Sequence, residues 1–143
     1  MKEGGVEMRK SRVVSLVVML LCSGFTVMAQ DTHIVKPQTV LTEIVEGMPK
    51  GEKQEVRVLN VTFQPHDKTF FHTHRFPVTV YVLEGAFTLE KEGQEPVTVK
   101  TGQAMLMPPH VRMTGYNKSG TELLRLIVFY VSDPDTPFLD AIH

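Results

Sequence analysis

The 143 residues carry a formal net charge of −1, and basic residues do not cluster after the first 12 positions, so nucleic acid is not an expected partner. The only cysteine, Cys22, lies in an N-terminal apolar stretch, so the rest of the chain has no thiol for a disulfide or a nucleophile. The length suffices for one domain with one hydrophobic core, but not for two.

Residues 1–29 have the pattern of a cleavable signal peptide. A basic segment precedes an apolar run over residues 13–25, which is shorter than the roughly 20 residues that a membrane-spanning helix needs. We predict cleavage before Gln30 and export to the periplasm or the medium, with no membrane attachment afterwards; an uncleaved membrane anchor is the alternative. Translation from Met8 fits such a peptide better than translation from Met1.

The chain after residue 30 has an all-β pattern. Short clusters of β-branched and aromatic residues alternate with turns rich in Gly, Pro and Asn, and no long stretch has helical spacing. Many short strands with tight connections are typical of a sandwich or a barrel. The predicted strands cover residues 40–45, 55–63, 69–74, 78–84, 86–91, 97–99, 104–107, 112–116 and 122–131.

Two of the predicted segments, 78–83 and 123–131, are apolar on both faces. In a sheet with one solvated side, the outward face of each strand is polar, so these segments need a second partner. We therefore predict a homodimer that buries their outer faces. Residues 133–143 show no periodicity and contain two prolines, which predicts a tail lying over the surface without a chemical role.

His72 and His74 are the candidate centre of a functional site. Side chains alternate along a strand with a period of two, so the two imidazoles point to the same face. Inside a barrel they would converge on one point, as a metal ion requires of its imidazole ligands. Val78, Val80 and Val82 fall on the same side, which predicts apolar surroundings for the pair.

Over residues 54–131 the sequence resembles the cupin superfamily. His72 and His74 match the His-x-His pair of the first cupin motif. The remaining matches are Gly85, which ends that motif, and Gly102, Pro108 and Asn117 of the second motif. The resemblance implies a jelly-roll barrel, or double-stranded β-helix, for residues 30–143. It also implies a transition metal, among Mn, Fe, Ni, Zn and Cu, held by three histidines and a glutamate.

The chain departs from these motifs at four positions. Val78 stands where the family has the glutamate ligand, and Met113 stands where it has the third histidine. His66 and His110 stand where the family has glycines. Two of the four ligands that the resemblance implies are therefore retained.

The retained pair leaves two interpretations of the site open. In the first, His72, His74 and Met113 bind a metal, and the combination of two imidazoles with a thioether favours copper, with Mn, Fe, Ni and Zn as alternatives. In the second, Met113 only fills the core and the histidines line a pocket without metal. His110 can supply a third imidazole if its loop folds inward. Otherwise His66 and His110 are solvent-facing turn residues whose backbones need no positive φ.

The resulting functional prediction is an exported cupin-domain protein that binds a small molecule, through a transition-metal site in the barrel interior. A metal-free module for ligand binding or sensing is the first alternative. A metal-dependent dioxygenase or isomerase is the second, and it rests on the resemblance alone. No catalytic residue is assigned by the sequence.

Overall fold

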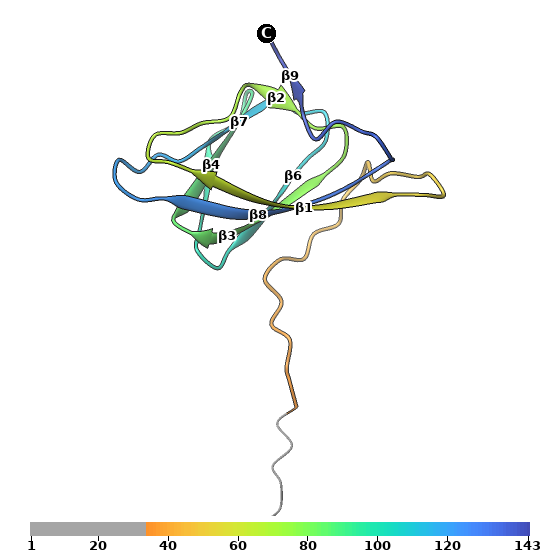
Figure 1. The fold of residues 1–143 in the computed structure, drawn as a ribbon, viewed down its shortest axis with the longest axis horizontal. Coiled ribbons are helices and arrows are strands. Elements are labelled where there is room, and N and C mark those ends of the chain that lie inside the picture. The colour runs from red at the N-terminus through yellow and green to blue at the C-terminus, as the bar shows by residue number, and fades with distance from the viewer. Residues whose placement is uncertain (1–33) are drawn as a thin grey trace, which may run out of the picture. The chain divides into compact units, whose positions relative to one another are not determined.

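Two antiparallel β-sheets enclose the core in the computed structural model, which describes residues 34–143 (Figure 1). One sheet has the order β1-β8-β3-β6, and the other has the order β5-β4-β7-β2-β9. The all-β prediction is confirmed. The strands are β1 (Glu55–Phe63), β2 (His72–Thr73), β3 (Val78–Glu84), β4 (Ala86–Lys91), β5 (Val97–Lys100), β6 (Ala104–Met107), β7 (Met113–Tyr116), β8 (Leu124–Ser132) and β9 (Asp140–Ala141).

The core lies between the two sheets and follows the alternation of the strands. In β8 the buried residues Leu124, Leu126 and Val128 alternate with outward residues. In the other sheet Phe87 and Leu89 point inward from β4, and both are almost completely buried. Burial of these side chains is the main driving force for folding, at about 1.5–3 kcal/mol for each large apolar side chain.

Most of the predicted strands are confirmed, four of them with the same bounds. Two predictions are wrong in extent. Residues 40–45 form no strand, because no strand within residues 34–143 pairs with their backbone. Of residues 69–74 only His72–Thr73 is a strand, since Thr69 instead bonds Gly115 through both its backbone N–H and its hydroxyl.

The C-terminal segment is part of the barrel, so the prediction of a surface tail for residues 133–143 is wrong. Strand β9 pairs with β2, and the N–H of Ile142 donates to the carbonyl of Phe71. The guanidinium of Arg75 binds the carboxylate of Asp140 through two hydrogen bonds of 2.8 and 2.9 Å. The chain therefore crosses the end of the barrel at which β2 lies (Figure 1).

Residues 37–143 form one compact unit. The predicted signal peptide, residues 1–29, lies outside the described residues. Within residues 34–143, no helix is long and apolar enough to cross a membrane.

Candidate metal and ligand site

His72 and His74 point into the interior, as the alternation predicts. Their exposed fractions are 4% and 1%. The two rings meet edge to face, with centroids 4.7 Å apart, and the two Nε2 atoms lie 3.1 Å from each other. Strand β2 positions His72, and the turn that follows β2 positions His74.

Both imidazoles are fixed by backbone carbonyls. Nδ1 of His72 lies 2.6 Å from the carbonyl oxygen of Phe70, and Nδ1 of His74 lies 2.6 Å from that of Phe138. A carbonyl oxygen only accepts hydrogen bonds, so each Nδ1 carries the hydrogen. In the neutral pair, both Nε2 atoms are therefore unprotonated, and they lie 3.1 Å apart.

Burial makes a charge on His74 unfavourable. Desolvation lowers the pKa of His74 from 6.5 to about 4, although the hydrogen bond to the carbonyl of Phe138 opposes this shift. The nearby His72 also contributes to the lowering of this pKa. His74 is therefore neutral near pH 7, which is the protonation state that binds metals.

The same shift predicts how the stability of the metal-free protein depends on pH. The unfolded chain binds a proton at His74 below about pH 6.5, whereas the folded protein binds it only near pH 4, so acid favours unfolding. We expect the free energy of unfolding to fall by about 2 kcal/mol from pH 7 to pH 5 through this residue. Urea unfolding in the presence of a chelator measures it. The His74→Ala variant should lose this part of the dependence, and the exposed His66→Asn variant should keep it.

Met113 lies next to the pair, as predicted. It is directly opposite His72 in the β2–β7 ladder and is completely buried, so the thioether and the imidazole share the inner face of the sheet. Val78 is also completely buried. Among the described residues, no group of three or more His, Cys, Asp or Glu side chains is arranged to hold a metal ion.

His110 does not join the site, and two of the interpretations of the loop histidines need correction. His66 and His110 are exposed, with φ values of 67° and 61°, so both backbones adopt the left-handed conformation that favours glycine. The statement that these positions need no positive φ is wrong. The backbone of His110 donates to the carbonyl of His74 at 2.8 Å, which ties this loop to the site through the main chain instead of an imidazole.

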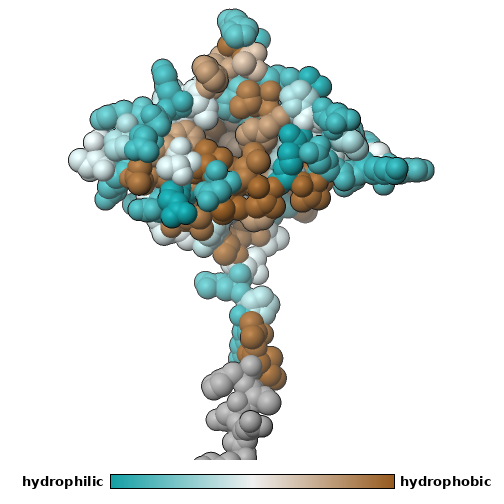
Figure 2. All heavy atoms as spheres, in the orientation of Figure 1, coloured by the Kyte–Doolittle hydropathy of each residue, from teal (hydrophilic) through white to brown (hydrophobic). Residues whose placement is uncertain are grey.

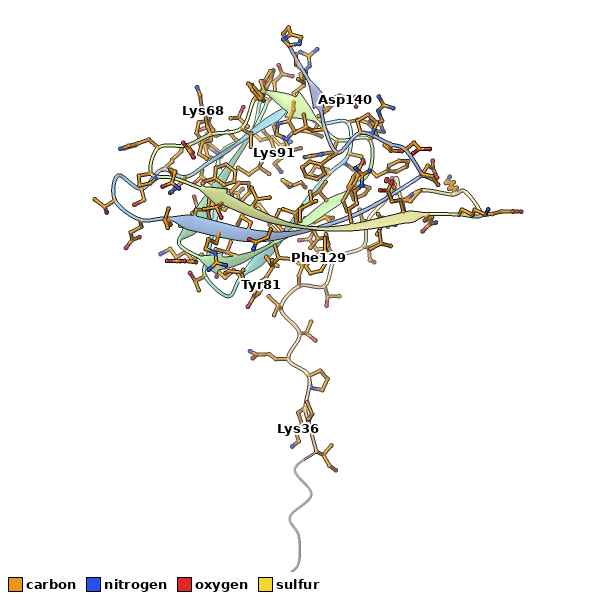
Figure 3. All side chains as sticks on the ribbon, in the orientation of Figure 1. Lys36, Lys68, Tyr81, Lys91, Phe129 and Asp140 are labelled. Carbon is orange, nitrogen blue, oxygen red and sulfur yellow. The ribbon has the colours of Figure 1, made fainter. Side chains whose placement is uncertain are left out.

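The sequence did not predict the contribution of the C-terminal segment. Phe138 orients His74 through its carbonyl, and its ring lies 4.9 Å from that imidazole, between centroids. The hydroxyl of Tyr130 points to the carbonyl of Pro137 at 3.4 Å. Figure 3 shows Asp140 at the end of the barrel where Figure 1 shows β2 and β9. The adjacent apolar residues Phe138 and Leu139 were the feature of the sequence that could have indicated a buried contact in this segment.

A small cavity of about 60 Å³ lies beside the two imidazoles. Its walls are aliphatic and aromatic side chains from both sheets, such as Val80, Phe87 and Leu126. The polar side chains in its lining are the two histidines and Thr69, and none of the lining side chains is an acid, a lysine or an arginine.

This architecture agrees with a comparison against protein families, in which the cupin domain model matches residues 59–130. The match covers slightly more than half of the chain. The protein is a cupin. No curated protein sequence matches this cupin.

Several solved structures share the fold of this cupin. A cupin-like protein from Thermotoga maritima is 22% identical with a TM-score of 0.53, and the alignment covers 61% of this chain and 64% of that one. An RmlC-like cupin with a double-stranded β-helix fold from Methanocaldococcus jannaschii is 24% identical with a TM-score of 0.50, covering 75% and 93%. The DMSP lyase DddQ from Ruegeria pomeroyi is 17% identical with a TM-score of 0.50, covering 57% and 41%. This cupin thus spans less than two thirds of the first and third of these proteins, and at such identities the similarity shows the fold alone.

Proposed function

We propose that this cupin binds a small molecule at a transition-metal site held by Nε2 of His72 and Nε2 of His74. The supporting observation is the arrangement of these two atoms, which are unprotonated in the neutral pair and 3.1 Å apart. Two metal–nitrogen bonds of about 2.0–2.1 Å that meet at about 100° place their nitrogens about 3.1 Å apart. Hydrogen bonds from Nδ1 to backbone carbonyls also fix the rings in the orientation that metal-binding imidazoles adopt.

Copper is the metal that these residues favour. Met113 places a soft sulfur beside His72, and the carboxylate that would favour a harder ion is replaced by Val78. The metal would supply a Lewis-acidic position at which a ligand is bound and polarised. The protein itself supplies two oriented imidazoles and apolar walls that exclude bulk water.

The ligand that fits the cavity is small. An engineered cavity of about 150 Å³ holds benzene, whereas the cavity beside the histidines has about 60 Å³. The lining contains no lysine or arginine, so the proposed metal would be the positive charge that pairs with an anionic group. The size of the cavity therefore favours molecules of a few non-hydrogen atoms.

Metal analysis of the purified chain after loading tests this proposal. We expect about one copper per chain to survive dialysis, and Mn, Fe, Ni and Zn to be retained less well. In competition with a coloured Cu(I) chelator, Met113→Leu should weaken Cu(I) binding about tenfold, equivalent to ~1.4 kcal/mol. Met105→Leu, which changes a buried methionine on β6 of the other sheet, is the matched control. If the two variants bind Cu(I) with equal affinity, Met113 is not a ligand of the metal.

A metal-free binding module is the second candidate. Burial of Val78 and the apolar lining of the cavity favour it, because neither feature contributes a metal ligand. Retention of no metal after loading with any of the five ions would support this candidate and contradict the first. Oxygen consumption with added phenols by the metal-loaded protein separates a dioxygenase from a binding protein.

We also propose that residues 1–29 direct export of this cupin. The supporting pattern is the basic segment followed by a short apolar run. Sequencing the N-terminus of the exported protein tests it, since cleavage at the predicted site leaves Gln30 first. A cell-associated protein that retains these residues would contradict the proposal.

A further inference from the structure

The C-terminal segment, residues 133–143, covers one end of the cavity beside the two histidines. Phe138 and Leu139 belong to the lining of this cavity, whereas most of the other lining residues belong to the barrel strands. The ring of Phe138 packs against His74 and Tyr130, with centroid distances of 4.9 and 5.4 Å. Figure 2 shows hydrophobic residues at this end of the barrel, next to the C-terminus that Figure 1 marks. Displacement of the segment would therefore open the cavity from this end.

The first half of the segment is anchored to the barrel core. The guanidinium of Arg57 donates a hydrogen bond to the carbonyl of Thr136, and another of 3.1 Å to the hydroxyl of Ser132. The same guanidinium lies 5.1 Å from the ring centroid of Tyr130, which adds a cation–π interaction. Tyr130 is completely buried in β8, so these contacts tie this half of the segment to the centre of the fold.

The second half of the segment is held closer to the surface. Strand β9 has two residues, lies at the edge of its sheet and pairs with β2, which also has two. The N–H of Ile142 adds a hydrogen bond to the carbonyl of Phe71. The ion pair of Arg75 and Asp140 completes the attachment, although these side chains are 52% and 38% exposed. Such short, solvated attachments open more readily than core strands do.

We infer that residues 138–143 form a gate to the site, and that the ion pair of Arg75 and Asp140 keeps this gate closed. The gate turns about the half of the segment that Arg57 anchors. The inference rests on the proposed function for what passes the gate, a metal or a small molecule. The gate itself can be measured without either.

Opening of the gate has two effects on His74. It removes Phe138 from the wall of the cavity, which gives a small molecule a path to the imidazoles. It also withdraws the carbonyl of Phe138 that accepts the hydrogen of Nδ1, so the ring of His74 is no longer fixed. Arg75 and Asp140 are therefore positioning residues, which act on the site through Phe138.

The energetics allow this opening without unfolding of the barrel. Phe138 is only partly buried, so its removal exposes less apolar surface than the removal of a core side chain does. An exposed ion pair is a weak attachment, and its two parallel hydrogen bonds give it the strongest geometry that such a pair has. The pair can therefore set how often the gate opens while contributing little to the stability of the fold.

Chemical modification of the histidines tests the gate in the metal-free protein. Diethyl pyrocarbonate transfers an ethoxycarbonyl group to an unprotonated imidazole nitrogen and releases carbon dioxide and ethanol. The reagent is larger than benzene, which needs about 150 Å³, so it does not fit the cavity of about 60 Å³ while the gate is closed. We expect slow modification of His72 and His74 and fast modification of the exposed His66 and His110. Peptide mass spectrometry measures the four rates in one sample.

Variants of the ion pair identify what holds the gate. Asp140→Arg should raise the modification rate of the two buried histidines about tenfold, because repulsion between like charges replaces the attraction to Arg75. The charge swap Arg75→Asp/Asp140→Arg should restore this rate to within about twofold of the unchanged chain. Glu90→Arg is the matched control, since the ion pair of Glu90 and Lys118 has the same length of 2.8 Å and side chains that are 39% and 51% exposed, and it involves neither the segment nor β2.

The gate is disproved if the buried histidines of the unchanged chain react as fast as the exposed ones, or if Asp140→Arg leaves their rates unchanged. A charge swap that fails to restore slow modification would overturn the role of the ion pair. Hydrogen exchange separates the gate from global unfolding. The amide of Ile142 should exchange at least about 100-fold faster than the amides of β8, and equal rates would mean that the segment opens only when the barrel unfolds.

The metal-loaded protein gives a second measurement. Transfer of Cu(I) from the chain to a chelator should be about tenfold faster in Asp140→Arg than in the unchanged chain, as the modification is. Equal transfer rates in these two proteins, with faster modification in the variant, would show that the metal leaves by another path and would overturn the gate. A chain that retains no metal contradicts the proposed function alone, because the modification rates are measured without metal.

Discussion

The double variant His72→Ala/His74→Ala is expected to retain no transition metal after loading and dialysis. The two Nε2 atoms supply the nitrogen donors of the proposed site, and alanine removes both. Loss of an outer partner of a metal ligand already weakens binding by about 10–100-fold. Each single substitution should therefore weaken binding by at least about 100-fold. Elemental analysis and titration of the metal measure both effects.

The control for this loss is His110→Gly. His110 is exposed, and its φ of 61° suits glycine, so the variant should keep the metal and the fold. Removing the strain of a left-handed residue should raise the free energy of unfolding by up to about 1 kcal/mol. Full retention of metal by the double alanine variant, with a cooperative thermal melt, would show that the metal lies elsewhere.

The regular strands of this cupin were predictable because the residue pattern within each strand is itself typical of a strand. Residues 78–84 and 104–107 alternate between the core and the outer face, and the structure has both strands with the predicted bounds. Residues 40–45 show the limit of this signal. Their β-branched residues favour an extended chain, but a strand also needs a neighbouring backbone, which depends on the whole assembly.

The inward direction of His72 and His74 was also predictable, since it depends on the period of a strand. The backbone groups that orient the two imidazole rings could not be predicted from the sequence. Nδ1 of each ring is bound by a backbone carbonyl, of Phe70 for His72 and of Phe138 for His74. Every residue has a backbone carbonyl, so the residue type at these positions does not indicate which carbonyl binds an imidazole. The partner of His74 is also 64 positions away, in a segment whose prolines indicate a loop.

The largest loss of stability is expected from Gly85→Ala. The φ of Gly85 is +80°, which costs an alanine about 1–2 kcal/mol. A Cβ atom at this position would also lie 2.4 Å from the carbonyl oxygen of Leu123, and this oxygen belongs to the backbone that leads into β8. Because the backbone cannot rotate away, we expect a total loss of about 3 kcal/mol or more, or a fall in Tm of about 15 °C. Urea and thermal unfolding measure it.

Gly102→Ala separates the two causes of this loss. Gly102 has nearly the same φ, +81°, but a Cβ atom there would meet no atom within 4 Å. Only the backbone cost remains, so its loss should be about 1 kcal/mol, with a fall in Tm of about 5 °C. Equal losses in the two variants would mean that the contact with Leu123 relaxes without cost. A larger loss for Gly85→Ala shows that the turn after β3 needs glycine for space as well as for conformation, because β8 approaches it so closely.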